Sequence, residues 1–369
     1  MSEAGSLYIA GGGTGGHLYP GLAIADALVS LQPSLDIIFI GAQRGIESSV
    51  LPTTRWRHEL LDLHPLYRSR PWQNWKTALG LRTAFRSIDR LAAARRPIGV
   101  LGTGGYAAGA LLGYARLHGL PYFLQEQNAV AGLTVKLFSS RARQIFVGFP
   151  EAIETLPASA RTRARVTGNP ITPPPQPLPD RAQARAAWGF PNEVKHVLLV
   201  FGGSQGSRAI NDATAAWLPH LLPPDWGALW VTGTTEHARL AHHGSNRVRV
   251  IAYQQPMAQA YATADLAVAR AGAMSTAELC AWSIPMVLIP LPTAAADHQT
   301  KNATALASVN AARVVLQESL SSGALGTTLD ELCADRAALA HMAVAAHGRA
   351  RVDASQVIAA SILASIDFK

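Results

Sequence analysis

The sequence contains few cysteines and few charged residues for a chain of 369 residues. Its two cysteines, Cys280 and Cys333, form no CxxC pair and have no histidine pair nearby, so we expect neither a disulfide framework nor a zinc site. This cysteine usage is typical of a reducing compartment. Charged residues make up 15% and hydrophobic residues 49%, which is not the balance of a disordered chain. At about 150 residues per domain, the length predicts two folded domains.

Several short patterns that would identify other protein classes are also missing. No lysine or arginine precedes Arg44, so we expect no secretory signal. The uncharged runs 98–115 and 279–296 are broken by six glycines and three prolines, respectively, and we expect neither to span a membrane. The Gly-Lys dipeptide does not occur, which excludes a P-loop. No Asp-x-Asp pair occurs either, so we expect no metal site for a nucleotide diphosphate and no cofactor.

Positive charge is in excess. Lysine and arginine number 32 against 24 acidic residues, which gives a formal net charge of +8. Such an excess favours anionic partners. On charge alone, nucleic acid, acidic lipid and phosphorylated ligands all remain open.

Short β-branched runs alternate with helical stretches along the chain, a pattern that predicts parallel α/β sheets. We expect strands at 7–10, 37–40, 122–124, 145–147, 197–201, 248–251 and 286–289. The proline-rich segment 168–180 can continue neither a helix nor a central strand, so we place the domain boundary there. We expect a first domain at 1–168, completed by a C-terminal helix around 350–369, and a second domain at 169–349.

Three glycine-rich turns each follow an apolar run: GGGTGGH at 11–17, GTGGYAAG at 102–109 and GGSQGS at 202–207. Glycine lets backbone N–H groups approach a diphosphate at a helix N-terminus, and in doubly wound folds such turns lie at the carboxyl ends of strands. The first turn matches the dinucleotide pattern GxGxxG. An NAD site also needs an acidic residue after the second strand, where residues 41–43 are Gly-Ala-Gln, so we do not expect a dehydrogenase.

Two residues beside such strand ends are candidate bases. His17 ends the first turn, where a helix N-terminus disfavours the protonated imidazole. A helix-capping or packing histidine is the alternative. Glu126 follows the apolar PYFL run and therefore lies at a strand end, where carboxylates are often catalytic or bind ligands. Asn128 offers both a donor and an acceptor to sugar hydroxyls.

The second half has its own polar groups. Arg270 lies at a strand end and suits a phosphate, and Glu278 lies about two turns into the next helix and suits a ribose diol. The downstream DHQTKNA segment groups hydrogen-bonding side chains: Asp297, His298, Gln299 and Asn302. This density suits a hydroxyl-rich ligand, and a solvated helix cap is the alternative.

The chain contains, in this order, GGGTGGHLYPGLAIADAL, GTGGYAAG, QEQNAVAGLT, GNP, GGSQGSRAIND, RAGAMSTAEL and DHQTKNA. In this set and order it resembles the MurG family of peptidoglycan N-acetylglucosaminyltransferases over nearly its whole length. The resemblance implies an α/β protein of GT-B type, with two Rossmann-like doubly wound domains facing across a cleft. It also implies an inverting hexosyltransferase that moves N-acetylglucosamine from UDP-GlcNAc to the C4 hydroxyl of the muramic acid of lipid I, giving lipid II. Such an enzyme would work peripherally at the cytoplasmic side of the inner membrane.

The family's site residues carry over onto matching positions of this chain. The first domain would hold the acceptor diphosphate at Thr14, Gly15, Gly16, Gly104, Gly105 and Tyr106, with Asn128 at the reacting sugar. The second domain would hold UDP-GlcNAc at Ser204, Gln254, Ala273, Met274, Ser275, Thr276, Ala277, Glu278, Gln299 and Asn302. We expect Arg270 to bind there as well, from its place at a strand end. As the base we rank His17 before Glu126.

Three positions depart from the family's pattern. The family commonly has histidine where Gln125 stands, a basic residue where Thr172 stands and an aliphatic residue where Gln254 stands. None of these departures removes a candidate catalytic group.

The segment 68–90 mixes apolar and basic side chains: Trp72, Trp75, Leu79, Leu81 and Phe85 with Arg68, Arg70, Lys76, Arg82 and Arg86. Aromatic and cationic groups together suit an anionic membrane surface, which an enzyme with a lipid-linked acceptor must reach. The alternative is an ordinary amphipathic helix whose core-facing residues are Ala78, Leu81, Phe85 and Ile88. We expect a mixed role, with one face in the core and the tryptophan end on lipid.

Two other functions remain open from the sequence. One is a related GT-B enzyme acting on UDP-GlcNAc, such as an epimerase, which would share the donor domain but need no lipid-facing aromatics. The other is a non-catalytic basic protein that binds nucleotides or nucleic acid. Against the second, no basic run accompanies a recognised nucleic-acid module and the glycine turns would be unexplained, so we expect no nucleic-acid partner.

Overall fold

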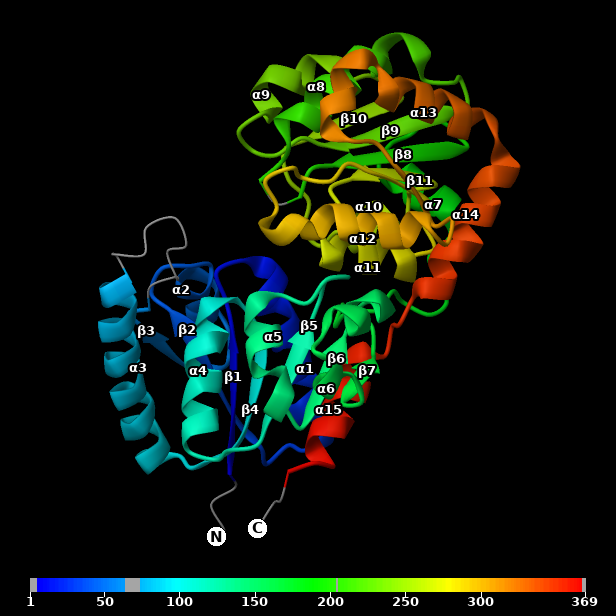
Figure 1. The fold of residues 1–369 in the computed structure, drawn as a ribbon. Coiled ribbons are helices and arrows are strands. Elements are labelled where there is room, and N and C mark those ends of the chain that lie inside the picture. The colour runs from blue at the N-terminus through cyan, green and yellow to red at the C-terminus, as the bar shows by residue number, and fades with distance from the viewer. Residues whose placement is uncertain (1–4, 64–73, 204, 367–369) are drawn as a thin grey trace. The chain divides into compact units, whose positions relative to one another are not determined.

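The computed structural model describes residues 5–63, 74–203 and 205–366 (Figure 1). The chain divides into two compact units, one comprising Met1–Ile171 with Asp353–Lys369 and the other Thr172–Val352. Each unit has its own parallel sheet and its own buried core.

The first unit is built on a seven-stranded sheet in the order β3-β2-β1-β4-β5-β6-β7. Its strands are β1 (Ser6–Gly11), β2 (Asp36–Ala42), β3 (Arg57–Leu61), β4 (Pro97–Gly104), β5 (Tyr122–Glu126), β6 (Gln144–Val147) and β7 (Ala164–Val166). Neighbouring strands are parallel, and the strand order reverses between β1 and β4. In doubly wound sheets, ligands bind at the carboxyl ends of the strands at such a reversal.

Helices cover both faces of this sheet: α1 (Gly15–Leu31), α2 (Glu47–Val50), α3 (Asn74–Ala94), α4 (Gly105–Leu117), α5 (Leu133–Phe138), α6 (Ala158–Arg161) and α15 (Ala354–Leu363). Successive strand residues point to opposite faces. Tyr8 and Ala10 therefore pack with α4 and α5, whereas Leu7 and Ile9 pack with α1 and α15. The C-terminal helix α15 thus completes the core of the first unit by packing against α1 (Figure 1).

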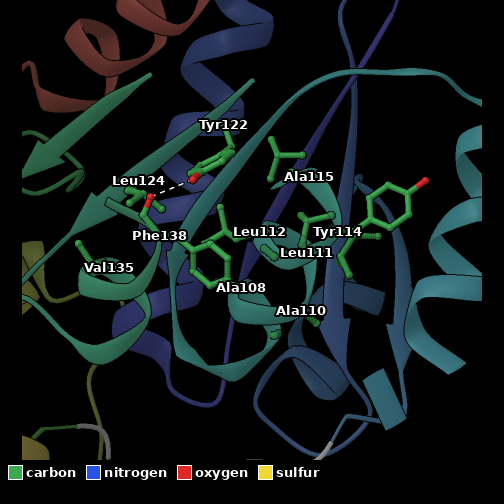
Figure 2. Packing of buried hydrophobic residues seen from close by; sticks show 14 of the residues in the cluster. Ala108, Ala110, Leu111, Leu112, Tyr114, Ala115, Tyr122, Leu124, Val135 and Phe138 are labelled. Carbon is green, nitrogen blue, oxygen red and sulfur yellow. Dashed lines mark hydrogen bonds between the residues drawn. The ribbon is translucent and has the colours of Figure 1, made fainter. Parts of the chain in front are cut away.

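Figure 2 shows the buried cluster under α4 and α5. Ala108 and Leu112 of α4, Leu124 of β5 and Phe138 of α5 belong to it. The hydroxyl of Tyr122 donates a hydrogen bond to the Phe138 carbonyl at 2.9 Å. This bond and the apolar packing tie α5 to the start of β5, and so help to fix the strand whose other end carries Glu126.

The second unit has a six-stranded parallel sheet in the order β10-β9-β8-β11-β12-β13. Its strands are β8 (His196–Phe201), β9 (Trp226–Val231), β10 (Val248–Ile251), β11 (Leu266–Ala269), β12 (Met286–Leu288) and β13 (Ala312–Val314). Its helices are α7 (Arg181–Ala187), α8 (Arg208–Leu221), α9 (His237–Leu240), α10 (Ala258–Tyr261), α11 (Ala273–Ala281), α12 (His298–Ala307), α13 (Ala324–Ala334) and α14 (Arg336–Arg349). Here the order reverses between β8 and β11, so the glycine turn after β8 lies beside Arg270 after β11.

The seven strands predicted from the sequence are confirmed, as is the α/β class. The strands β3, β4, β7, β9 and β13 were not predicted, and β11 was expected only as the strand that ends before Arg270. The segment 168–180, between β7 and α7, contains no helix or strand, as its prolines predict. Within the described ranges, no helix is both long enough and apolar enough to cross a bilayer.

Candidate active site

The two glycine turns of the first unit pack directly against each other. Gly11 and Gly104 are partners in the β1–β4 register, and the Gly12 N–H donates to the Gly104 carbonyl at 3.3 Å. Gly104 and Gly105 have φ values of +109° and +79°. A Cβ on Gly105 would lie 2.1 Å from the Gly12 carbonyl oxygen, so no side chain fits at this contact. The result is a backbone-lined surface at the carboxyl ends of β1 and β4.

His17 lies in the first turn of α1, directly beside this surface. Its Nδ1 is 3.1 Å from the Gly12 carbonyl oxygen and 3.3 Å from the Thr14 hydroxyl. Because a carbonyl can only accept, Nδ1 carries the proton and Nε2 is the basic nitrogen of the neutral ring. A Cβ on Gly104 would lie 2.5 Å from His17 Cδ2 and 3.0 Å from Nε2. The basic edge of the ring therefore lies against the second glycine turn.

Tyr106 is the next predicted residue at this surface. Its ring lies beside Gly13, where an added Cβ would be 3.4 Å away, and its hydroxyl donates to the Arg44 carbonyl. Burial raises the pKa of the Tyr106 hydroxyl, the Glu47 carboxylate adds to the rise and Arg44 opposes it. The phenol therefore stays neutral near pH 7. The structure thus brings together the predicted acceptor-side residues: Thr14, Gly15, Gly16, His17, Gly104, Gly105 and Tyr106.

Glu126, the second candidate base, is buried and fully engaged by its own loop. Its Oε1 accepts from the backbone and side-chain nitrogens of Asn128 at 3.0 and 3.1 Å, and its Oε2 accepts from the Gly132 N–H at 2.7 Å. These bonds shape the loop and orient Asn128. Because both oxygens are already acceptors, the geometry favours His17 over Glu126 as the group that takes a proton.

A buried polar network under the glycine turns includes residues that the sequence reasoning missed. Thr103 donates to the His17 carbonyl at 2.7 Å, and Gln127 donates to the Thr103 carbonyl at 2.7 Å. Asn169 donates to the Gln127 carbonyl at 2.9 Å and accepts from Gln125 at 3.2 Å. The asparagine of the GNP motif and the unusual Gln125 therefore support the floor of the site. Consecutive polar residues after an apolar strand were the available signal.

Glu47 was also missed. It is fully buried, and it accepts hydrogen bonds from the Gly13 N–H at 2.9 Å and the Ala42 N–H at 3.3 Å. The sequence offered no acidic residue directly after the second strand. The fold supplies one from α2, but its carboxylate binds the protein's own backbone.

In the second unit, Arg270 directly follows β11, beside the turn that follows β8. Its guanidinium donates to the Ser207 hydroxyl at 2.8 Å, to Gln317 Oε1 at 2.6 Å and to the Ile289 and Pro290 carbonyls, each at 3.1 Å. Burial lowers the pKa of Arg270, and no carboxylate of the described residues forms an ion pair with it. Ser207 also caps α8 by accepting from the Ile210 N–H at 3.4 Å. A cation balanced by neutral acceptors at a helix N-terminus suits an anionic ligand.

Glu278 lies on α11, whose N-cap at Gly272 makes no side-chain hydrogen bond. The Tyr261 hydroxyl donates to Glu278 Oε2 at 2.7 Å. Burial raises the pKa of Glu278, while the bond from Tyr261 opposes the rise. The residues Ala273, Met274, Ser275 and Ala277 form the preceding part of α11, and Thr276 is buried with its hydroxyl bonded to the Gly272 carbonyl at 3.0 Å.

The DHQTKNA segment forms the start of α12 and supports neighbouring turns. Gln299 Oε1 accepts from the Leu291 N–H at 3.0 Å. Asn302 is fully buried and donates to the Ala271 carbonyl at 3.1 Å. The Asn302 side chain has no exposed surface and holds the turn after Arg270. The sugar contact expected for Asn302 stays a prediction. Ala296 and Asp297 have φ values of 52° and 54°, a strained backbone of the kind found at functional sites.

Three further positions were predicted as site residues or noted as departures from the family's pattern. Ser204 lies outside the described residues. Gln254, in the loop after β10, donates to the Pro256 carbonyl and to Gln259 Oε1, both at 3.0 Å, so its amide is engaged within its own loop. Thr172 is exposed at the first position of the second unit.

Comparison with known proteins matches both halves of the chain. Residues 7–147 match the glycosyltransferase family 28 N-terminal domain, and residues 197–358 match the glycosyltransferase family 28 C-terminal domain. A protein of Salinibacter ruber named UDP-N-acetylglucosamine--N-acetylmuramyl-(pentapeptide) pyrophosphoryl-undecaprenol N-acetylglucosamine transferase is 41% identical over 99% of this chain and 98% of its own. A protein of the same name from Moorella thermoacetica is 38% identical over 98% of this chain and 99% of its own. The crystal structure of Acinetobacter baumannii MurG superposes with a TM-score of 0.77 at 28% identity, covering 98% of this chain and 99% of that one.

Proposed function

This chain belongs to glycosyltransferase family 28, and from that premise we propose how its two units share one reaction. It is a UDP-GlcNAc-dependent N-acetylglucosaminyltransferase of GT-B fold that acts on lipid I in peptidoglycan synthesis. The observation that carries this function is the 41% identity to a transferase of that name over 99% of the chain, because the match spans both units. An epimerase or a nucleic-acid-binding protein would not account for it.

The first unit binds lipid I, with its diphosphate at the backbone-lined surface between Gly12 and Gly105. His17 Nε2 takes the proton from the C4 hydroxyl of the muramic acid as that oxygen attacks the anomeric carbon of N-acetylglucosamine. The bond from this carbon to UDP breaks, and the configuration inverts. The support is the backbone packing of the two turns and the position of the Nε2 edge against Gly104.

The second unit binds UDP-GlcNAc. Arg270 and the N-termini of α8 and α11 stabilise the departing diphosphate, a role that needs no metal. Glu278 accepts hydrogen bonds from the ribose hydroxyls. The support is the half-buried cation at the N-cap of α8 and the carboxylate already oriented by Tyr261.

The function is tested by following UDP release and transfer of labelled N-acetylglucosamine, with and without a lipid I analogue. We expect UDP release to require the acceptor and to continue in EDTA. Conversion of UDP-GlcNAc into an isomeric UDP-sugar without acceptor would support an epimerase. Loss of UDP-GlcNAc binding in EDTA would contradict the metal-free assignment of the donor site.

Replacing Glu278 by alanine should weaken UDP binding by about 1.5 to 3 kcal/mol, the value of a charge-assisted hydrogen bond. Isothermal titration measures this. Tyr261→Phe is the matched control, because it removes only the hydroxyl that orients the carboxylate and should cost less. Because burial raises the pKa of Glu278, acidification should weaken UDP binding at a higher pH than an exposed glutamate would. An unchanged dissociation constant in Glu278→Ala would place the ribose elsewhere.

The first unit also carries the segment that we propose contacts an anionic membrane surface, at the cytoplasmic side of the inner membrane. Trp72 lies outside the described residues, as does the side chain of Trp75. In the described part of α3, Ile88 is fully buried, whereas Leu81 is 36% exposed. The alternative in which Leu81 faces the core is therefore wrong; among the described side chains of α3, the first buried one is that of Ala84. The exposed Leu81 is an apolar side chain outside the buried face of α3, which supports an apolar contact with the membrane.

Changing both Trp72 and Trp75 to serine should reduce flotation with liposomes that contain acidic lipid and should lower turnover of lipid I. The wild-type protein should bind more weakly as salt rises, since each basic residue near the surface contributes about 1 kcal/mol. The melting temperature and UDP affinity should stay close to those of the wild type. Unaltered flotation would place the membrane surface elsewhere, and a collapse of the melting temperature would make the two tryptophans core residues.

A further inference from the structure

Glu47 is a buried carboxylate that touches the turn holding His17. It has no exposed surface, and its oxygens accept from the Gly13 N–H at 2.9 Å and the Ala42 N–H at 3.3 Å. A Cβ added to Gly12 would lie 1.8 Å from Glu47 Oε1, so the carboxylate is packed against the turn itself. No room is left between them for a ligand, and any effect of Glu47 on the reaction must pass through the backbone.

One peptide group connects Glu47 to His17. The Gly12 carbonyl and the Gly13 N–H belong to the same peptide unit. Glu47 accepts from its N–H, and His17 Nδ1 lies 3.1 Å from its carbonyl oxygen. Carboxylate, peptide and imidazole therefore form one continuous chain of hydrogen bonds.

Such a chain has two physical consequences. An anionic acceptor on the N–H polarises the peptide and makes its carbonyl oxygen a stronger acceptor, because hydrogen bonds in series reinforce each other. This holds the proton on Nδ1 and leaves Nε2 as the basic nitrogen. The negative charge also stabilises the imidazolium formed when Nε2 takes a proton, which offsets the opposing field of the α1 N-terminus. A catalytic-triad aspartate acts on its histidine in the same sense, but by direct contact.

The other charged and titratable groups around the turn do not replace Glu47 in this role. Arg44 forms an ion pair with Asp62 at 3.3 Å, and the Tyr106 hydroxyl donates to the Arg44 carbonyl. Burial raises the pKa of Tyr106, so that group stays neutral. Thr103 bonds the His17 carbonyl rather than its ring.

We propose that Glu47 is a positioning residue that acts through the Gly12–Gly13 peptide to fix the tautomer of His17 and to strengthen Nε2 as a base. The inference rests on the proposed role of His17 in the transfer reaction. It assigns a function to a residue that touches neither substrate.

The test is Glu47→Gln, which keeps the side-chain size but removes the charge. Nitrogen-15 spectra of the histidine-labelled full-length protein report the tautomer of His17, with the resonance assigned from a His17→Gln sample. We expect the wild type to carry the proton on Nδ1 and the variant to lose this preference. We expect kcat to fall about 10- to 100-fold, the loss typical for outer hydrogen-bond partners of metal-ligating histidines, with KM for UDP-GlcNAc unchanged. The acid limb of the kcat/KM profile should move to lower pH.

A second variant and a control distinguish the loss of the Glu47 charge from other effects of a substitution. Glu47→Asp keeps the charge on a shorter side chain, so kcat should fall while the acid limb of the kcat/KM profile stays near its wild-type position. If Glu47→Gln does not fold, Glu47→Asp still tests the role of the side chain. Asp36→Asn removes a carboxylate at the opposite end of β2, where it pairs with Arg95 at 3.2 Å, and should leave the tautomer unchanged. An unchanged tautomer in Glu47→Gln, or equal movement of the acid limb in both Glu47 variants, overturns the inference. A changed tautomer without any change in the pH profile would instead remove His17 as the base, and with it the proposed mechanism.

Discussion

Replacing His17 by alanine should lower kcat for lipid I by about 10² to 10⁴, the contribution of a general base, with the affinity for UDP nearly intact. The reason is geometric. His17 Nδ1 is tied to the Gly12 carbonyl, which leaves Nε2 to accept the proton beside the second glycine turn. Transfer rates at saturating UDP-GlcNAc and titration with UDP measure the two quantities separately.

His118→Ala is a suitable control for this variant. His118 lies just after α4 in the same unit, with 43% of its side chain exposed and its ring stacked on Tyr114. We expect it to leave turnover unchanged. Full activity of the His17 variant would exclude this histidine as the base. A large loss of acceptor affinity at unchanged kcat would make His17 an anchor for the diphosphate instead.

The glycine turns of the candidate site could be predicted because single residues determine their backbone geometry. Gly13 and Gly104 have φ values of +87° and +109°, which residues with side chains rarely adopt. Glycine clusters after apolar runs therefore marked both the strand ends and the helix starts. The positions of Arg270 directly after a strand and of Glu278 on the following helix could be predicted in the same way, whereas their roles in binding stay predictions.

The supporting residues could not be predicted, because their partners are distant in sequence. Glu47 meets Gly13 across 34 residues, and Gln125 meets Asn169 across 44. No local pattern marks such a pair. For Asn302, the polar composition of DHQTKNA pointed to a ligand, but only the packing of α12 shows that this side chain points into the protein.

Replacing Glu126 by alanine should lower the free energy of unfolding by about 2 to 4 kcal/mol. The change leaves the backbone N–H groups of Asn128 and Gly132 without their acceptor, and an unpaired buried donor costs about 1 to 3 kcal/mol. Denaturant unfolding measures the loss. Glu154→Ala is the matched control: its carboxylate is 78% exposed and pairs with Arg161 on the surface, so its removal should cost less than about 1 kcal/mol.

Measuring both the stability and the kcat of Glu126 variants distinguishes between the two candidate bases, His17 and Glu126. Glu126→Gln keeps an amide oxygen that can still accept from one of the two N–H groups, so it should be more stable than the alanine variant. If Glu126 only shapes the loop that carries Asn128, the folded glutamine variant should keep most of its kcat, because a base that is still present at His17 does the chemistry. A loss of kcat as large as that of His17→Ala, in a glutamine variant of near wild-type stability, would show that Glu126 takes the proton and that its loop bonds open during the reaction.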